Sequence, residues 1–386
     1  MEPAELIAII NRDEDSKHQF KANITNQISL AHEMVAFSNS GGGEIYIGVS
    51  NDGTIAGLTR DDVSRINLII SDAASQHVKP AINPLTENIK TLEGLVIRLE
   101  IANGINKPYQ DKDGVFWVKS GSDKRKATSR EEIQRLFQSA SLIHGDEAIV
   151  QGLGLEDIDR EYFKDFCDKN VINSVKYDDL PLSNLLQNMN LMHDGLLNIC
   201  GALMFSKYPS IKLPLFIVKA IAFSGNEIHE SRYQDKEDLT GRIDEIYKKS
   251  ISFILRNIQH TQQEQGVNSH GKPEIPKLVL EELMVNALIH RDYLISAPIR
   301  LFIYTNRIEI ISPGHLPNNL TIENIKMGNS NIRNPILASY ATKTLPYSGI
   351  GSGIIRSLKK YPHIQFENDQ SGNQFIVNIF RNKTIE

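Results

Sequence analysis

The spacing of apolar and polar residues predicts a chain that mixes helices with short strands. In the first third, apolar residues recur every three or four positions in three segments, residues 28–40, 60–78 and 129–140. Ser129 stands before the acidic first turn of the last segment, as a helix cap does. Apolar runs predict strands at residues 92–102 and 114–121, and two more around the Asn-Asp-Gly turn in residues 41–58. We therefore expect a small α/β domain over residues 1–140.

The rest of the chain predicts two further domains. Residues 141–270 read as a connecting α+β domain, with helices at 161–170, 182–192 and 242–259, buried strands at 201–207 and 214–225, and a polar loop or hairpin at 260–276. Residues 271–386 begin with a strongly apolar helix at 279–293. Strands joined by a tight Thr-Asn turn, a glycine-rich loop entering a helix and a final hairpin then follow, at 299–312, 348–361 and 364–380.

Length and composition narrow the class of protein. A chain of 386 residues is too long for one compact core, so two or three domains are expected. The net charge is −5, so any nucleic-acid surface must be a local basic patch. Cys167 and Cys200 lack the spacing of a zinc site or a disulfide framework, which fits a reducing compartment. No apolar run reaches membrane-spanning length, and the N-terminus is acidic and amphipathic, so we expect a cytoplasmic protein.

The helix predicted at residues 279–293 carries one polar seam. Glu282, Asn286 and His290 are spaced four apart, and nearly every other position is apolar. Residues with this spacing share one stripe of a helix, and a helix that is apolar on its other sides is normally buried. Three readings stay open: the seam faces a cleft, it is a hydrogen-bonded network in the core, or it faces solvent.

A glycine-rich segment supplies the chemistry that the seam would need. Gly349, Gly351 and Gly353 directly precede a predicted helix, where glycines let backbone N–H groups approach phosphate closely. Asn286 offers an oxygen to Mg²⁺, and Glu282 could polarise a water molecule toward a γ-phosphate. Gly314 would form a turn beside a nucleotide base. The alternative is an ordinary loop that starts a helix.

These motifs, in this order, resemble the GHKL ATP-binding fold of gyrase, histidine kinase and MutL proteins. The resemblance implies a helix-on-sheet sandwich, with ATP and Mg²⁺ as ligands. Asn286 would hold Mg²⁺, Glu282 would be the catalytic residue, and Gly349, Gly351 and Gly353 would bind the triphosphate. The strings "VNALIHRDY", "IEIISPGHLP" and "GIGSGI" look closer still to the divergent ATPase domain of bacterial Schlafen-like regulators. One departure is Ser312, which stands where the GHKL pattern has the Asp that reads adenine.

The first third of the chain resembles the AlbA-type domain shared with Schlafen proteins. The resemblance rests on "EDSKHQFK", "MVAFSNSGGGEIYIGVSNDGTIAGL" and "FWVKSGSDKRKATSREEI", in that order. Schlafen nucleases cleave RNA with a cluster of acidic residues and a metal. Glu14 matches the first acidic position, Gln19 replaces the second, and Asp52 lies in the turn that would carry the third. A neutral amide cannot act as a charged ligand or base, so Gln19 argues against nuclease activity.

A basic cluster makes nucleic-acid binding the expected role of this domain. The cluster follows Phe116 and Trp117 and comprises Lys119, Lys124, Arg125 and Lys126, with Lys21 as a further charge. Such a cluster neutralises phosphates, and an aromatic ring can stack on an unpaired base. The alternative is a solvated loop beside two core aromatics.

Together these features predict a regulator that binds ATP and nucleic acid, DNA or RNA, and acts in transcriptional control or phage defence. The nucleotide state of the GHKL-like domain would be coupled to the AlbA-like domain. We expect an ATPase at most, a homo-oligomer, and no membrane partner. The alternatives are a Schlafen-type metal-dependent ribonuclease and a catalytically dead assembly module.

Overall fold

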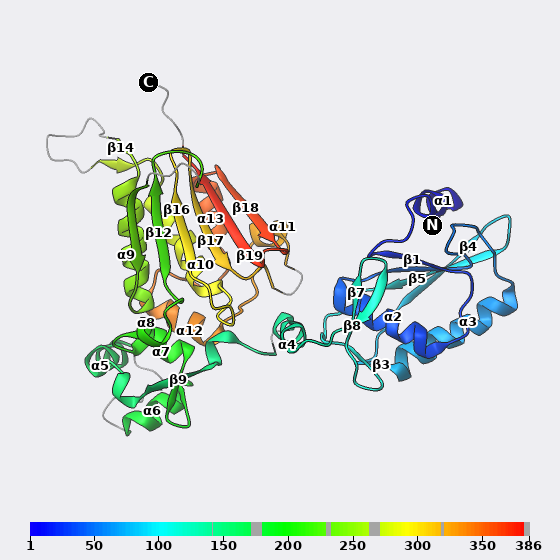
Figure 1. Cartoon of the computed structure of the whole chain (residues 1–386), viewed down its shortest axis with the longest axis horizontal. Helices are drawn as coiled ribbons and strands as arrows, with labels where there is room; N and C mark the ends of the chain where they lie inside the picture. Colours follow the sequence, from blue (N-terminus) through cyan, green and yellow to red (C-terminus); the bar gives the residue numbers. More distant parts are fainter. Residues whose placement is uncertain (141, 171–179, 229–232, 262–270, 318–319, 382–386) are drawn as a thin grey trace. The chain divides into compact units, whose positions relative to one another are not determined.

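The chain forms two units in a computed structural model that describes all residues except 141, 171–179, 229–232, 262–270, 318–319 and 382–386 (Figure 1). The N-terminal unit is Met1–Ile143 and the C-terminal unit is His144–Glu386. Both contain helices and strands, which confirms the predicted mixed α/β class. In the described part of the chain, no helix has the length and apolar character needed to cross a bilayer.

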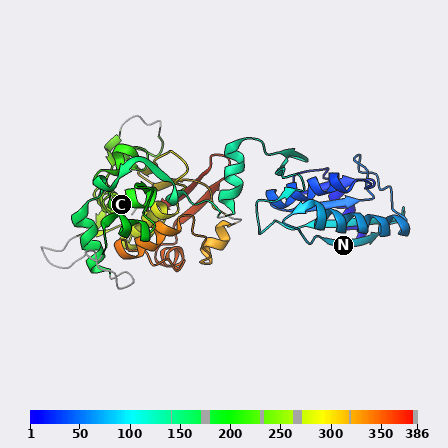
Figure 2. The ribbon, with the colours of Figure 1, turned by 90° about the horizontal axis from the view of Figure 1, so that it is seen from below.

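A four-stranded sheet with helices on both faces organises the N-terminal unit. Its strand order is β1 (His18–Lys21), β2 (Gly43–Ile47), β5 (Leu95–Ile101) and β4 (Leu85–Lys90). Only the β1–β2 pair is parallel. The helices α2 (Gln27–Ser40) and α3 (Arg60–Asp72) lie together on one side (Figures 1 and 2), and α1 (Pro3–Ile10) packs on the other. Successive strand side chains alternate between the two faces, so Ile45 and Ile47 join the α2–α3 core and Tyr46 joins the α1 core.

Local sequence explains where these helices start and stop. The Asn26 side chain accepts hydrogen bonds from the backbone of Ile28 and Ser29 at the start of α2. Gly41, with φ +106°, ends α2 in a left-handed conformation that favours glycine. Thr59 and Asp62 form a reciprocal capping box at α3. These helices match the sequence prediction because their signals lie within a few residues of each end.

Two predictions for the N-terminal unit differ from the structure. The second strand expected within residues 41–58 is only an isolated bridge between Val49 and Ile55. The strand expected at residues 114–121 is present as β7 (Trp117–Ser120), but it forms a hairpin with β8 (Asp123–Lys126), a strand that the sequence did not predict. The remaining elements of the unit are β3 (Val78–Lys79), β6 (Gln110–Asp111), α4 (Arg130–Ser139) and a π-helical turn at Ala73–His77.

A six-stranded sheet dominates the C-terminal unit. Its order is β13 (Tyr233–Leu239), β12 (Val218–Phe223), β16 (Ile299–Ile303), β17 (Arg307–Pro313), β19 (Gln374–Phe380) and β18 (Ile364–Asp369). Only β12 and β16 pair in parallel. The helices α9 (Ile243–Asn257) and α10 (Lys277–His290) cover one face of this sheet (Figure 1).

The domain boundary expected at residue 270 falls inside this sheet. The strands β12 and β13 precede that residue and β16 to β19 follow it, yet Val218 pairs with Ile299 in one ladder. One hydrophobic core also runs through both predicted domains. Strand pairing across some eighty residues leaves no mark in local sequence, because the partner's position depends on the fold of everything between.

A smaller part of the same unit packs beneath the sheet ends and shares its core. It contains β9 (Ile149–Gly154), β10 (Met192–His193), β11 (Leu196–Asn198), α5 (Arg160–Lys169), α6 (Leu182–Asn188), α7 (Ile199–Phe205) and α8 (Pro209–Lys212). The prediction of a strand at residues 201–207 is wrong, because most of these residues belong to the helix α7. The Asn198 side chain caps that helix by accepting a hydrogen bond from Gly201 N. A short apolar run buried on every side has no periodicity that separates helix from strand.

Further helices, a short hairpin and two short turns complete the described part of the C-terminal unit. They are α11 (Ile322–Lys326), α12 (Pro335–Thr344), α13 (Gly353–Lys360), the hairpin strands β14 (His260–Thr261) and β15 (Lys272–Pro273), and short 3-10 turns at Gly145–Glu147 and Leu155–Asp157. The β14–β15 pair agrees with the polar loop or hairpin predicted at residues 260–276, whose centre lies outside the described residues.

A buried carboxyl group fixes the start of α12 and should make stability depend on pH. Asp146 is fully buried, and its Oδ2 accepts a hydrogen bond of 2.8 Å from Leu337 N. Burial raises the pKa of Asp146 to about 6. The folded state therefore gains from this proton at low pH, and that stability is lost as pH rises through about 6.

Asp146→Asn should consequently stabilise the protein more at pH 7 than at pH 4, by about 1–3 kcal/mol in the free energy of unfolding. The amide oxygen can still accept the Leu337 hydrogen bond, so the difference between the two pH values isolates the charge. Urea unfolding of both proteins at both pH values measures it. A variant destabilised equally at pH 4 and pH 7 would contradict the raised pKa.

Candidate functional site

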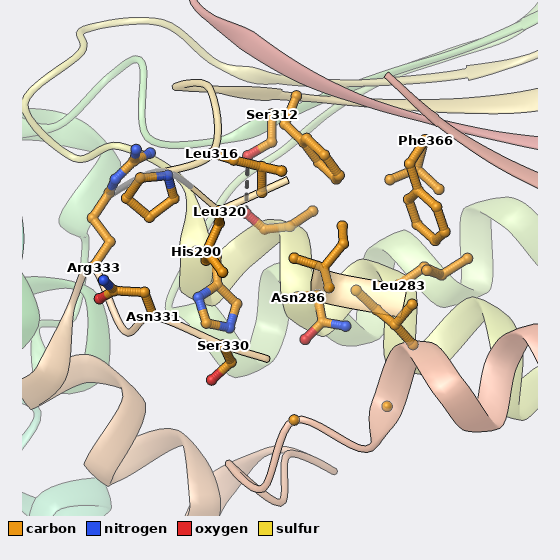
Figure 3. A pocket seen from close by; sticks show the side chains of 18 of the residues that line it. Leu283, Asn286, His290, Ser312, Leu316, Leu320, Ser330, Asn331, Arg333 and Phe366 are labelled. Carbon is orange, nitrogen blue, oxygen red and sulfur yellow. Dashed lines mark hydrogen bonds between the residues drawn. The ribbon is translucent and has the colours of Figure 1, made fainter. Parts of the chain in front are cut away.

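A pocket opens in the C-terminal unit between α10, the sheet and the segment before α13 (Figure 3). It encloses about 1050 Å³ when its open mouth is included. Much of its lining is apolar and comes from α10 and the strands: Leu283, Ala287, Ile310, Phe366, Phe375 and Val377. A cavity with apolar walls and a few convergent polar groups is typical of a small-molecule site.

The polar seam of α10 faces this pocket. Glu282, Asn286 and His290 all line it, while the other sides of α10 lie in the hydrophobic core. Figure 3 shows the Asn286 and His290 side chains pointing into the cavity. The seam therefore borders a cavity and not open solvent. Glu282 is 7% exposed, so its carboxylate needs partners within the site.

The three glycines predicted to bind phosphate also line the pocket. Gly349 and Gly351 have φ of +69° and +74°, a region that favours glycine. A Cβ on Gly351 would lie 2.3 Å from Gly328 O, so only glycine lets these two loops touch. Gly353 begins α13, and a Cβ there would lie 2.2 Å from Glu282 Oε2. The segment thus brings its backbone against the α10 seam.

An ion pair joins the seam to α13. Arg356 Nη2 donates to Glu282 Oε1, and the two side chains are 47% and 9% exposed. Asn286 lies next to them, since the same Cβ on Gly353 would be 3.6 Å from its Nδ2. Within the described part of the chain, the side-chain amide of Asn286 has no hydrogen-bond partner. Its oxygen is therefore available to a ligand.

Ser312 and Gly314 line another part of the pocket, at the end of β17. Ser312 is buried, and its Oγ donates a hydrogen bond of 3.2 Å to Ala287 O, which Figure 3 draws as a dashed line. Because its proton is engaged there, the hydroxyl oxygen can only accept from a ligand. Gly314 has φ +96°, and a Cβ on it would lie 2.3 Å from Arg333 Nη1. The Arg333 guanidinium in turn donates a hydrogen bond of 2.6 Å to His315 O.

Several lining residues were absent from the sequence prediction. They are Arg333, Tyr347, Phe366, Asn331 and Ser330. The alternation of apolar residues along the final hairpin could have placed Phe366 on the helix-facing side of the sheet. No local pattern marks Arg333 or Tyr347, because loops bring them to the pocket from outside any periodic element.

The basic residues of the N-terminal unit lie on neighbouring elements. Lys119, Lys124, Arg125 and Lys126 are on the β7–β8 hairpin, and Lys21 ends β1. Several already have partners. Lys124 Nζ is 2.5 Å from Glu33 Oε1, which is buried, and Arg125 forms two hydrogen bonds of 2.6 and 2.9 Å with Glu132.

Lys119 and Lys126 contact aromatic rings. Lys119 Nζ lies 4.5 Å from the Phe37 ring centroid and donates to Ser122 O, and burial lowers its pKa. Lys126 Nζ lies 5.4 Å from the Trp117 centroid. Trp117 also stacks on His32, with 4.3 Å between centroids, and its indole N–H donates to Asp111. Trp117 is thus partly committed inside the unit.

The acidic positions do not converge on a metal site. Glu14 Oε1 accepts a hydrogen bond of 2.7 Å from Phe20 N, and Asp52 Oδ1 accepts one of 2.9 Å from Thr54 N. Gln19 is buried and donates to Glu33 Oε1 at 3.2 Å. Among the residues that the structure describes, no group of three or more His, Cys, Asp or Glu side chains is placed to hold a metal ion.

Two segments of the chain match known families. Residues 14–128 match the family described as "Schlafen, AlbA_2". Residues 296–382 match the family described as "Putative ATP-dependent DNA helicase recG C-terminal". The chain combines an AlbA/Schlafen-like region with an ATPase-like region. These two regions together suggest a nucleic-acid-related ATPase activity. The helix α10, with Glu282 and Asn286, lies before the second matched segment.

Solved structures also match the chain, at low sequence identity. One is the crystal structure of the DIP2311 protein from Corynebacterium diphtheriae, at 19% identity and a TM-score of 0.48, covering 98% of this chain and 80% of that one. Another is the solution structure of the N-terminal domain of a RecG-related protein from Nitrosomonas europaea, at 17% identity and a TM-score of 0.24, covering 34% and 96%. No curated protein matches the chain.

The histidine of the α10 seam is neutral at physiological pH. His290 keeps some surface on the pocket of the ATPase-like region, yet burial lowers its pKa to about 4. Its Nε2 lies 3.2 Å from the Tyr347 hydroxyl. The neutral imidazole contributes stability fully above pH 6.5, and this contribution is lost as pH falls through about 4. His290 therefore acts in the site as an uncharged hydrogen-bonding group.

Proposed function

We propose that this chain binds ATP with Mg²⁺ in the pocket of the ATPase-like region and hydrolyses it slowly. The observation that carries the proposal is the convergence of Glu282, Asn286 and Gly353 at one end of an apolar pocket. A carboxylate, a free amide oxygen and a close backbone approach are the groups that a metal-bound triphosphate requires. Water would attack the terminal phosphorus, its proton would pass to the Glu282 carboxylate, and ADP would leave with the electrons of the broken P–O bond.

Other residues of the pocket would bind the metal ion and the adenine ring. Asn286, with its unpartnered amide, would hold Mg²⁺, which neutralises phosphate charge when bound. Ser312 can accept a hydrogen bond from the amino group of adenine, because its own proton is engaged with Ala287 O. The apolar lining from α10 and the strands would enclose the faces of the ring.

Thermal unfolding tests the ATP proposal. Millimolar Mg²⁺–ATP should raise the melting temperature of the parent protein, since a ligand that binds only the folded state stabilises it. ADP should do so less. Absence of any shift, together with absence of heat in calorimetric titration, would overturn the proposal.

In the AlbA/Schlafen-like region, we propose nucleic-acid binding, regulated by the nucleotide state of the ATPase-like region. Lys21 and Lys126 support it, because within the described residues neither ammonium has an acidic partner. A regulator of transcription or of phage defence fits such a combination.

The test is nucleic-acid affinity with and without a non-hydrolysable ATP analogue. Equal affinities would contradict the coupling. A homo-oligomeric state stays a prediction, which light scattering measures.

The metal-dependent ribonuclease has less support than binding. The amide of Gln19 replaces one carboxylate, and Glu33 beside it is neutralised by Lys124. We expect purified protein to leave RNA intact with Mn²⁺ present. Cleavage that disappears in Glu14→Ala would favour the ribonuclease instead. The assembly module would be favoured by a stable oligomer that binds neither nucleotide nor nucleic acid.

Two lysines of the same strand should behave differently. Lys126→Ala removes a charge from the surface, so nucleic-acid affinity should fall and the log–log salt slope should lose about one unit. Lys124→Ala leaves the buried Glu33 carboxylate without its cation, so the free energy of unfolding should fall by about 1–3 kcal/mol. Thermal melts and salt-dependent binding measure the two effects. Adding Glu33→Gln to Lys124→Ala should restore stability; a double variant as unstable as the single one would contradict the structural role.

A further inference from the structure

The Glu282 carboxylate lies where the phosphate end of a nucleotide would meet α13. Its Oε2 is so close to the backbone of Gly353 that a Cβ there would stand 2.2 Å away. Its Oε1 accepts from Arg356, one turn further along α13. The backbone at Gly353 and the Arg356 guanidinium therefore both lie against one anion. In this structure that anion is the Glu282 carboxylate.

This arrangement places the base and the anion in competition. While Glu282 Oε1 accepts the hydrogen bond from Arg356, that oxygen is engaged and is not free to accept a hydrogen bond from an attacking water. A terminal phosphate entering beside Gly353 would bring a second, larger anion to the same guanidinium. Arg356 cannot pair fully with both anions, since one planar guanidinium forms its strongest paired hydrogen bonds with one anion at a time.

The Arg356 side chain can exchange one anionic partner for another, in addition to linking α10 and α13. Its side chain is 47% exposed, in contrast to the 9% of Glu282, so the guanidinium can move while the carboxylate stays. It lies one turn along α13 from Gly353, the residue at which the glycine segment enters the helix. Exchange of one anion for another leaves the guanidinium paired throughout, and the attacking water would become the partner of the released Glu282 carboxylate.

We propose that Arg356 is the residue by which the pocket distinguishes a nucleoside triphosphate from a diphosphate. Without a terminal phosphate, Arg356 holds Glu282 and engages the oxygen that would accept from water. With a triphosphate, Arg356 transfers to the terminal phosphate, and Glu282 is released to accept the proton of the attacking water. The inference rests on the proposed ATP site and adds the switch that couples phosphate recognition to activation of the base.

Calorimetric titration of the full chain with a non-hydrolysable Mg²⁺–ATP analogue and with Mg²⁺–ADP tests the switch. The parent should prefer the analogue, and Arg356→Ala should reduce the ratio of the two affinities by about 10-fold or more, the scale of a lost charge-assisted hydrogen bond. Lys359→Ala, which removes a cation from the same helix, should leave the ratio unchanged. Arg356→Lys should recover part of it.

A second measurement separates recognition from simple stabilisation. Glu282→Gln removes the competing anion, so affinity for the analogue should rise several-fold, and that gain should vanish when Arg356→Ala is added. If Arg356→Ala weakens the analogue and ADP equally, or changes neither, Arg356 only ties α13 to α10 and the inference is overturned while the ATP site stands. If the parent binds neither nucleotide, the proposed function and the inference both fail.

Discussion

Glu282→Gln should lower ATP hydrolysis by about 100-fold or more while ATP binding is retained or strengthened. The amide keeps the shape of the side chain but cannot take a proton from water, and loss of a general base has this scale. Glu282 is the carboxylate that lies against Gly353 in the pocket. Single-turnover hydrolysis and calorimetric titration with the ATP analogue measure the two quantities separately.

Asn286→Ala is the matched variant on the next turn of α10. It removes the unpartnered amide oxygen from the pocket, so Mg²⁺–ATP affinity should fall, whereas affinity for ATP without metal should change little. The ligand-free melting temperature should stay close to that of the parent. If both variants melt lower and neither they nor the parent respond to ATP, the seam is a structural network and the nucleotide assignment is wrong.

Gly351→Ala should abolish most nucleotide binding, whereas Gly349→Ala should weaken it only modestly. Both positions have a left-handed backbone, with φ of +74° and +69°, so alanine is strained at each by about 1–2 kcal/mol. They differ in their surroundings. A Cβ on Gly351 would lie 2.3 Å from Gly328 O, while one on Gly349 would meet nothing nearer than 3.8 Å.

The comparison isolates the contact between the two loops from backbone strain. Separation of Gly351 from Gly328 would move the glycine segment away from α10, and we expect a fall in ATP affinity of at least about 10-fold beyond that of Gly349→Ala. Titration of both variants, with melting curves as the control for folding, measures the difference. Equal losses in the two variants would mean that the loop contact does not shape the site.

The sequence by itself determined the parts of this protein that depend on neighbours along the chain. The spacing of apolar residues placed α2, α3, α9 and α10, and the cap Ser129 marked where α4 begins. The four-residue spacing of Glu282, Asn286 and His290 fixed them on one stripe of α10. The glycines at residues 349, 351 and 353 marked a close backbone approach before α13. Such features need no distant partner, so they are legible in a short window.

Only the tertiary structure decided what depends on distant partners. The apolar run at residues 201–207 is the helix α7 and not a strand, because burial on every side removes the periodic signal. β12 pairs with β16 across the expected boundary at residue 270. Lys124 is bound by the buried Glu33, and Arg356 holds Glu282, although each pair is separated by more than seventy residues. The partner of a charge is chosen by packing, because any acid of the chain could neutralise it and only the fold brings one of them within reach.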